Sequence, residues 1–229
     1  MPIGEGQRRA RRTLARLRKA HPDARCALVH EDPFQLLVAT VLSAQTTDTA
    51  VNQVTVELFQ RWGNAEALSR ARVSDVERVI NRIGMYRQKA RNIVGLANRI
   101  VKMHGGRVPS QMAQLVELPG VGRKTANVVL GVAFARPEGI VVDTHVARLS
   151  QRLGWTAQTD PVKIERDLLA LFPRSSWDAL GHTLIFHGRR VCSAARPACS
   201  TCAINDACPS AYCAENVGRK PKRSRGRTD

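Results

Sequence analysis

The sequence contains no long apolar run, and its first residues lack the apolar stretch of a secretory signal. A membrane-spanning helix needs roughly 18 consecutive apolar residues, and a signal peptide needs an apolar segment before its cleavage site. We therefore expect a cytoplasmic protein that is neither secreted nor inserted in a membrane. Alternating apolar and polar residues are also scarce, and this scarcity disfavours β-strands.

Acidic residues are the second shortage. The 229 residues include 36 Lys and Arg but only 19 Asp and Glu, which gives a formal net charge of +17. Such an excess indicates a polyanionic partner, with nucleic acid favoured over a membrane surface. The length allows one large domain or two small ones, and 43% hydrophobic residues can bury a core.

Helix-start signals divide most of the chain into short amphipathic segments. Asp32-Pro33 and Asp160-Pro161 each predict an N-cap followed by the first helical residue. Asp48 is expected to cap another helix, and Ser74 with Glu77 predicts a capping box. The sequence thus predicts an all-α fold. The expected helices cover 1–20, 34–44, 49–62, a segment from 74 that is broken at 84–86, 87–104, 110–117, 123–134, 144–153, 161–171 and 177–190.

Two glycines mark the most informative stretch, Leu-Pro-Gly-Val-Gly-Arg-Lys-Thr-Ala at 118–126. Gly120 and Gly122 flank Val121, and glycine permits the positive φ of a tight turn and the close approach of another backbone. A helical run starts at Arg123. The first amides of a helix have no partners within it, so this end can bind a phosphate.

Lys124 lies in the first turn of that helix, and Asp143 follows in Val-Val-Asp-Thr-His on a different element. A lysine amine can act as a nucleophile. Asp143 could hold the lysine, accept a proton or face a developing positive charge. It could also simply cap the helix that follows it.

Five of the six cysteines fall between Cys192 and Cys213, and four of them follow the spacing Cys192-x6-Cys199-x2-Cys202-x5-Cys208. In an intracellular protein such a cluster indicates metal binding more often than disulfides. Four thiolates at these positions can hold a tetrahedral zinc ion or a [4Fe–4S] cluster, and the spacing alone does not choose between them.

The motifs at 118–126 and 141–145 together resemble the helix–hairpin–helix of the endonuclease III family of DNA glycosylases, and the resemblance extends from about residue 26 to 208. It implies a helical barrel domain over 26–136 and an iron–sulfur domain made of 1–25 and 137–215. It also implies a base excision repair enzyme that removes oxidised pyrimidines and nicks the abasic site by β-elimination. From its composition, 216–229 is expected to be a disordered basic tail.

The resemblance also implies site residues. Lys124 would attack the sugar C1′ and form a Schiff base, with Asp143 as the essential carboxylate, and the four cysteines would hold one structural [4Fe–4S] cluster. Damaged double-stranded DNA would be the partner of a monomer associated with the nucleoid. The residues expected to contact this DNA are Gln45, which matches the family's inserting glutamine, Met85 at the position of the apolar wedge, Gly120, Val121, Gly122, Arg123 and Arg196.

Two other functions fit parts of this pattern. A monofunctional glycosylase, such as the adenine or mismatch-thymine enzymes, shares the aspartate but typically lacks the lysine, so Lys124 argues against it. A non-catalytic DNA-binding module would use the hairpin only as a phosphate clamp, and the pair of Lys124 and Asp143 argues against that. Gln45 could also be a helix C-cap and Met85 a core residue, while His145 is expected to be a buried, hydrogen-bonded histidine without a chemical role.

Overall fold

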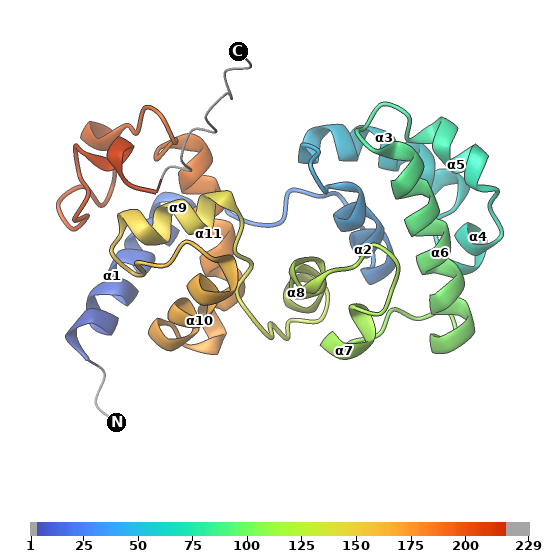
Figure 1. Ribbon diagram of the computed structural model, residues 1–229, viewed down its shortest axis with the longest axis horizontal. Coiled ribbons are helices and arrows are strands. Elements are labelled where there is room, and N and C mark those ends of the chain that lie inside the picture. Colours follow the sequence, from blue (N-terminus) through green and yellow to red (C-terminus); the bar gives the residue numbers. More distant parts are fainter. Residues whose placement is uncertain (1–3, 219–229) are drawn as a thin grey trace, which may run out of the picture. The chain divides into compact units, whose positions relative to one another are not determined.

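The computed structural model describes residues 4–218, and all regular structure within that range is helical (Figure 1). The expected all-α class is confirmed. Every helix in this range is too short or too polar to cross a lipid bilayer. The α-helices are α1 Glu5–Ala20, α2 Pro33–Leu42, α3 Asp48–Arg61, α4 Ala65–Ser69, α5 Val73–Val79, α6 Tyr86–His104, α7 Met112–Leu115, α8 Arg123–Val132, α9 Thr144–Arg152, α10 Pro161–Leu171 and α11 Trp177–Arg190.

The chain separates into two compact units. One is the continuous segment Cys26–Gly139, which contains α2 to α8. The other joins the residues up to Arg25 to those from Ile140 onward, so it combines α1 with α9, α10 and α11. Of the predicted tail at 216–229, only 216–218 belong to the described residues.

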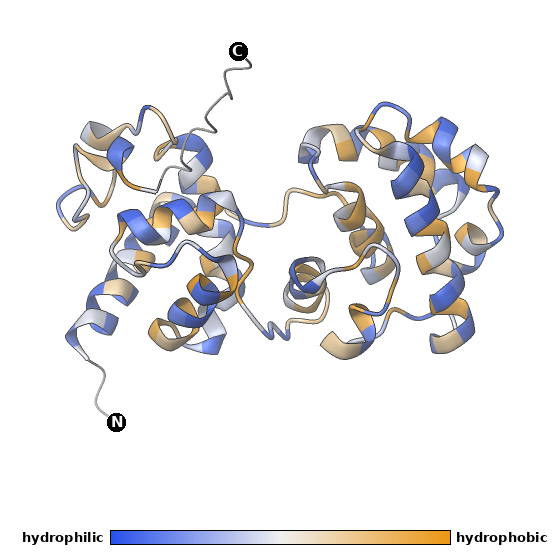
Figure 2. Ribbon diagram, in the orientation of Figure 1, coloured by the Kyte–Doolittle hydropathy of each residue, from blue (hydrophilic) through white to orange (hydrophobic). Residues whose placement is uncertain are grey.

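The Cys26–Gly139 unit has a core of aliphatic side chains around α2. This helix buries every residue from Phe34 to Leu42 because it has no polar face to turn toward solvent, and Figure 2 shows its strong hydropathy. It contacts α3, α6 and α8. The amphipathic α6 contributes Ile93, Leu96 and Ile100 to the same core. Burial of apolar area at about 25 cal/mol per Å² is therefore the main stabilising term of this unit.

The second unit has a smaller apolar core. The basic helix α1 buries Leu14 and Leu17 and packs against α10 and α11. Trp155 and Phe172 meet edge to face, with ring centroids 4.9 Å apart. Between α11 and residue 218, where the described part of the chain ends, the regular structure consists of short 3-10 turns at Cys199–Thr201 and Ala214–Asn216. Residues 191–218 are therefore without an α-helix, and contacts to the rest of the unit must hold most of this segment in place.

Two of the predicted helix caps are confirmed and two are wrong. The Asp32 carboxylate accepts from the Gln35 amide at 2.8 Å, and Asp160 caps α10 in the same way. Helix α3, however, begins at Asp48, and its cap is Thr47, whose hydroxyl accepts a hydrogen bond from the Ala50 amide. The capping box at Ser74 does not form, because Ser74 lies inside α5.

Two predicted helix lengths also change. Helix α5 ends at Val79, so the break comes before the Gly84–Tyr86 segment where we expected it. The helix predicted for 110–117 shrinks to α7, since Leu118 turns back to bind the Leu115 carbonyl. The helix over 87–104 is confirmed as α6, and Gly105 with φ 58° ends it.

Candidate active site

The turn between α7 and α8 depends on Gly120. The Val121 amide donates to the Leu118 carbonyl at 3.1 Å, and Gly120 has a φ of 77°, in the left-handed region. A Cβ atom on Gly120 would lie 2.8 Å from Nδ2 of Asn92, so the position also lacks space for a side chain. Val121, only 6% exposed, anchors the turn in the apolar core. Conformation and packing together hold the start of α8 in place.

Gly122 has a different reason to be glycine. It is the N-cap of α8 with an ordinary φ of −95°, and nothing lies within 4 Å of the place where its Cβ would be. Glycine has no side chain with which to cap the helix. No side chain caps the N-terminus of α8, and a helix end of this kind can bind an anion through its amides and its dipole.

Lys124 is the second residue of α8, directly after this open N-terminus, and its side chain is exposed. Ala126 and Asn127, on the following turn, are buried. The lysine therefore stands on the solvent side of a helix whose other side is fixed in the core. An amine in this position can reach a ligand that binds the open helix end.

Asp143 belongs to the other unit, where it caps α9. Its Oδ1 atom accepts from the amides of His145 and Val146, each at 2.8 Å. None of the hydrogen bonds described for residues 4–218 uses Oδ2. One carboxylate oxygen is thus committed to the cap, and the other can act on a ligand.

His145, the second residue of α9, is half-buried and hydrogen-bonded. Its Nδ1 lies 3.1 Å from Nη2 of Arg148, and burial lowers the pKa of the His145 imidazole. Arg148 donates in turn to the carbonyls of Gly188 and Cys192. Through this arginine, the helix that Asp143 caps is bonded directly to the segment that carries the cysteines.

Cys192, Cys199, Cys202 and Cys208 line one apolar cavity together with Leu149 and Leu153. Among the described residues, no three His, Cys, Asp or Glu side chains are placed to bind one and the same metal ion. The four cysteines thus share one cavity. Cys213 is exposed, and Cys26 lies partly buried against the core of the other unit.

Arg152 holds the first part of the cysteine segment. It is 1% exposed, and its Nη1 lies 3.2 Å from Sγ of Cys192. The same guanidinium group donates to the carbonyls of Ser193, Ala194 and Val217. A cation this deeply buried needs such a set of acceptors to offset its lost hydration. The arginine therefore fixes two distant parts of the segment at once.

Two more cysteine sulfurs have polar contacts: the Cys208 thiol donates to the Arg152 carbonyl at 3.7 Å, and Nε2 of His187 lies 3.6 Å from Sγ of Cys202. Nδ1 of this histidine lies 2.9 Å from Nε2 of His21, and burial lowers the pKa of His187 to about 4. Burial also raises the pKa values of the Cys202 and Cys208 thiols. Buried thiols of this kind stay protonated unless a metal ion replaces the proton.

Comparison with known proteins agrees with this geometry. A family model described as "HhH-GPD superfamily base excision DNA repair protein" matches residues 38–174. Endonuclease III of Synechocystis sp. is 50% identical over 205 residues, which cover 90% of this chain and 94% of the relative. Endonuclease III of Escherichia coli is 40% identical over 195 residues, or 85% and 92% of the two chains.

The chain belongs to the endonuclease III family. A solved structure of a trapped endonuclease III–DNA covalent intermediate superposes with a TM-score of 0.84 at 42% identity, covering 90% of this chain and 96% of the other. As a member of the endonuclease III family, the protein is a base excision repair enzyme that combines DNA glycosylase and abasic-site lyase activity.

Two of the DNA-contacting residues that the endonuclease III resemblance implies share an unusual backbone. Gln45 has a φ of 54° and Met85 a φ of 57°, and both side chains are exposed. Ser43, not Gln45, is the C-cap of α2, and Met85 is 51% exposed, so neither of the plainer alternatives holds. Left-handed backbone in a residue other than glycine costs energy and is concentrated at functional sites.

Arg196 lies in the segment between Cys192 and Cys199. The Ser193 hydroxyl accepts from the Arg196 amide at 3.2 Å and donates to the Arg196 carbonyl at 2.7 Å. The Arg196 side chain itself is exposed. Sequence reasoning identified this arginine but missed Arg148, Arg152 and His187, because nothing in the local pattern separates a buried cation from a surface one.

Proposed function

We propose that this enzyme removes oxidised pyrimidines from duplex DNA and nicks the resulting abasic site, with Lys124 as the nucleophile. The observation that carries the proposal is the exposed Lys124 beside the open N-terminus of α8. The covalent intermediate trapped between DNA and the related endonuclease III supports a covalent step.

In the proposed reaction the Lys124 amine attacks C1′ of the damaged nucleotide. The N-glycosidic bond breaks, and its electron pair leaves with the base, which takes up a proton. The sugar ring opens as the nitrogen and C1′ form an imine. Loss of a C2′ proton then expels the 3′ phosphate, and hydrolysis of the imine releases the lysine.

Asp143 would stabilise the positive charge that builds up on the sugar as the base leaves. Its Oδ1 is held by two backbone amides, which fixes the direction of the carboxylate. Its Oδ2 would then face the developing charge from a preorganised position. Preorganised charges of this kind are usually the largest single contribution to catalysis.

Damaged duplex DNA would be held by several basic and open features. A phosphate would bind the N-terminus of α8 at Gly122 and Arg123, beside the turn formed by Gly120 and Val121, and Arg196 would contact another phosphate. The formal net charge of +17 supports this electrostatic term. Gln45 and Met85 would fill the gap left by the extruded nucleotide. We further propose that the enzyme acts as a monomer on the nucleoid in the cytoplasm.

The four cysteines would hold a [4Fe–4S] cluster. A zinc ion needs all four sulfurs about 2.3 Å from one point, whereas a cubane binds each sulfur through a different iron atom. Four cysteines around one cavity support a metal centre, and the resemblance to endonuclease III favours the cluster over a zinc ion. When bound, the cluster would cross-link a segment that spans Cys192 to Cys208 and present Arg196 to DNA.

Borohydride trapping tests the proposed nucleophile. Wild-type protein should give a covalent adduct on damaged duplex, because borohydride reduces the imine. Lys124→Ala and Lys124→Gln should lose trapping and nicking yet still bind lesion DNA, while Lys102→Ala, an exposed lysine on α6, serves as the matched control. A trapped adduct with Lys124→Ala would mean that another amine attacks.

Asp143→Asn tests the carboxylate separately. The amide oxygen can keep the cap hydrogen bonds, so folding and DNA binding should be normal. Base removal should fall by ~10² or more, the scale of a lost electrostatic contact in a transition state. A pre-formed abasic site should be processed with a smaller loss, because no base has to leave. A variant that is less stable, but whose folded fraction removes the base at the wild-type rate, would show that Asp143 is only a cap.

A further inference from the structure

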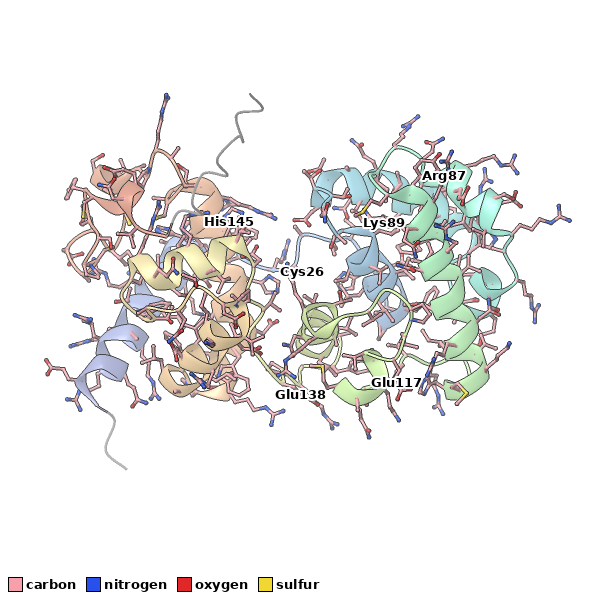
Figure 3. All side chains as sticks on the ribbon, in the orientation of Figure 1. Cys26, Arg87, Lys89, Glu117, Glu138 and His145 are labelled. Carbon is pink, nitrogen blue, oxygen red and sulfur yellow. The ribbon has the colours of Figure 1, made fainter. Side chains whose placement is uncertain are left out.

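Lys89 is a buried lysine that the proposed chemistry does not use. It lies one turn into α6 (Figure 3), and the residue is only 3% exposed. Its ammonium donates to Oγ1 of Thr46 at 2.7 Å. Among the described residues, no carboxylate pairs with it, and this hydroxyl is its single side-chain partner. Such burial keeps the Lys89 amine from DNA, so it cannot replace Lys124 as the nucleophile.

Thr46 closes the turn that carries Gln45. The Thr46 amide donates to the Ser43 carbonyl at 3.1 Å, which makes a four-residue turn with Gln45 in its third position. Gln45 holds a left-handed φ of 54°, and its side chain is exposed. A non-glycine residue keeps such a backbone only when its surroundings enforce it. The hydrogen bond from Lys89 fixes the residue directly after Gln45.

Met85 is held by the same lysine through the backbone. The Lys89 amide donates to the Met85 carbonyl at 3.0 Å, which is the first hydrogen bond of α6. Met85 is the N-cap of this helix, also with a left-handed φ, of 57°. Side chains on a helix lean toward its N-terminus, so Lys89 extends back past Met85 to reach Thr46.

We infer that Lys89 is a positioning residue that holds the Gln45 turn in register with Met85, so that both side chains enter the duplex together. The inference rests on the proposed function, in which these two residues fill the gap left by the extruded nucleotide. It deepens that function by naming what couples two segments that are 40 residues apart in sequence, since 85 − 45 = 40.

Stability alone gives no reason for a lysine here. An ammonium withdrawn from water, with one neutral hydroxyl as its side-chain partner, is less favourable than an apolar side chain of similar shape. A methionine at the same position would fill a similar volume without the charge. Replacing Lys89 should therefore leave folding intact or improve it, while a positioning role predicts a loss of function.

The experiment compares Lys89→Met and Thr46→Val, each of which removes the hydrogen bond and keeps the side-chain shape. Lys102→Met, an exposed lysine on the same helix, is the control, and Thr46→Ser retains the hydroxyl. Each protein receives a duplex with one oxidised pyrimidine opposite 2-aminopurine, whose fluorescence reports unstacking of the orphaned base. Single-turnover base removal and nicking of single-stranded abasic DNA are measured in parallel.

Lys89→Met and Thr46→Val should each lower the 2-aminopurine signal and slow base removal in duplex by roughly 10- to 100-fold, the range for a misplaced group away from the chemistry. The double variant should be no slower than either single variant, because both remove one interaction. Nicking of single-stranded abasic DNA should be unchanged, since no gap is filled there. Thr46→Ser, unlike Thr46→Val, should remove the base from duplex at the wild-type rate, because it keeps the hydroxyl group.

Two results would overturn the inference. The first is a Lys89→Met protein with the fluorescence signal and duplex rate of Lys102→Met. The second is an equal loss of rate in Lys89→Met on duplex and single-stranded substrates, which would show that Lys89 acts on the stability of the whole protein and not on the Gln45 turn. If the wild type and Lys102→Met themselves fail to remove the oxidised base or nick, the proposed function fails instead, and the two failures are thus distinguished.

Discussion

The two units differ in how many ionisable side chains they bury. In Cys26–Gly139, Lys89 is the only charged residue among the described buried ones. The other unit buries Arg148, Arg152 and Glu165 as well as two histidines. The first unit is thus held together by apolar packing, while Arg148 and Arg152 of the second donate to carbonyls of the segment that follows α11.

The two units also differ in where their candidate functional residues lie. The apolar unit is rigid in its core and carries its candidate site on exposed turns at Gln45, Met85 and Gly122. The polar unit has its most specific interactions inside, where Arg152 meets the cysteine segment. Loss of a core contact should therefore lower the free energy of unfolding of the first unit. Loss of one of the four cysteines proposed as metal ligands should unfold part of the second unit.

The largest effect should come from removing a cysteine ligand. Wild-type protein should contain about four irons per chain and absorb broadly in the visible range. Cys202→Ala should lose the cluster, and proteolysis should then digest the part after Ile140 while Cys26–Gly139 persists. Cys213→Ala, at an exposed cysteine outside the cavity, should keep its iron. Full iron content in Cys202→Ala, or a colourless protein with one zinc, contradicts the ligand set.

Arg152→Gln should have the next largest effect. It removes donors to Cys192, Ser193 and Ala194 and leaves their buried acceptors unsatisfied. The free energy of unfolding should fall by about 3 kcal/mol, as for other broken buried charge contacts. Urea denaturation measures the loss. Arg166→Gln, on the exposed side of α10, should change it by less than about 0.5 kcal/mol; equal effects would refute the special role of Arg152.

Substitutions of the two hairpin glycines should have different effects, one on the free energy of unfolding and the other on DNA affinity. Gly120→Ala should cost about 1–3 kcal/mol, because alanine must adopt a φ of 77° and displace Asn92. Gly122→Ala meets no steric obstacle in the protein and should unfold like the wild type, yet it should bind duplex DNA more weakly. Urea denaturation and DNA titration at one fixed salt concentration compare the variants. Unchanged DNA affinity in Gly122→Ala would contradict the proposed binding of a phosphate at this helix end.

The smallest effect should appear as a pH dependence. Burial lowers the pKa of Lys89 below its ordinary value of 10.5, so the unfolded chain binds more protons than the folded one between the two values. Stability therefore rises with pH across that window. Lys89→Met should be as stable as the wild type or more so at neutral pH, and any advantage should shrink as pH approaches 10.5. An advantage that grows with pH would contradict a desolvated ammonium.

Helices and caps set by local interactions could be predicted from the sequence. Asp32, Asp143 and Asp160 cap helices where expected, because a carboxylate and the amides two or three residues later need no distant partner. The cap of α3 was misplaced by one residue, since Thr47 and Asp48 are both good caps and only the chain path decides between them.

Tertiary contacts could not be predicted in the same way. Arg152 and Lys89 resemble ordinary surface charges, because their helices are amphipathic and their partners lie about 40 residues away in sequence. The left-handed backbone at Gln45 and Met85 was equally hidden, as neither residue type favours it. The identities of the candidate site residues were therefore accessible from motifs, while the groups that hold them in place were not.

The discontinuity of the second unit has a consequence for synthesis on the ribosome. Helix α1 emerges first, but its packing partners α10 and α11 follow only after the whole of Cys26–Gly139. The Arg16 guanidinium likewise waits for Asp206, which it meets at 2.7 Å. The continuous unit can thus fold during translation, while the unit with the cysteines must close a long loop afterwards. Insertion of the proposed cluster would therefore follow the completion of the chain, because Cys192 to Cys208 are synthesised last.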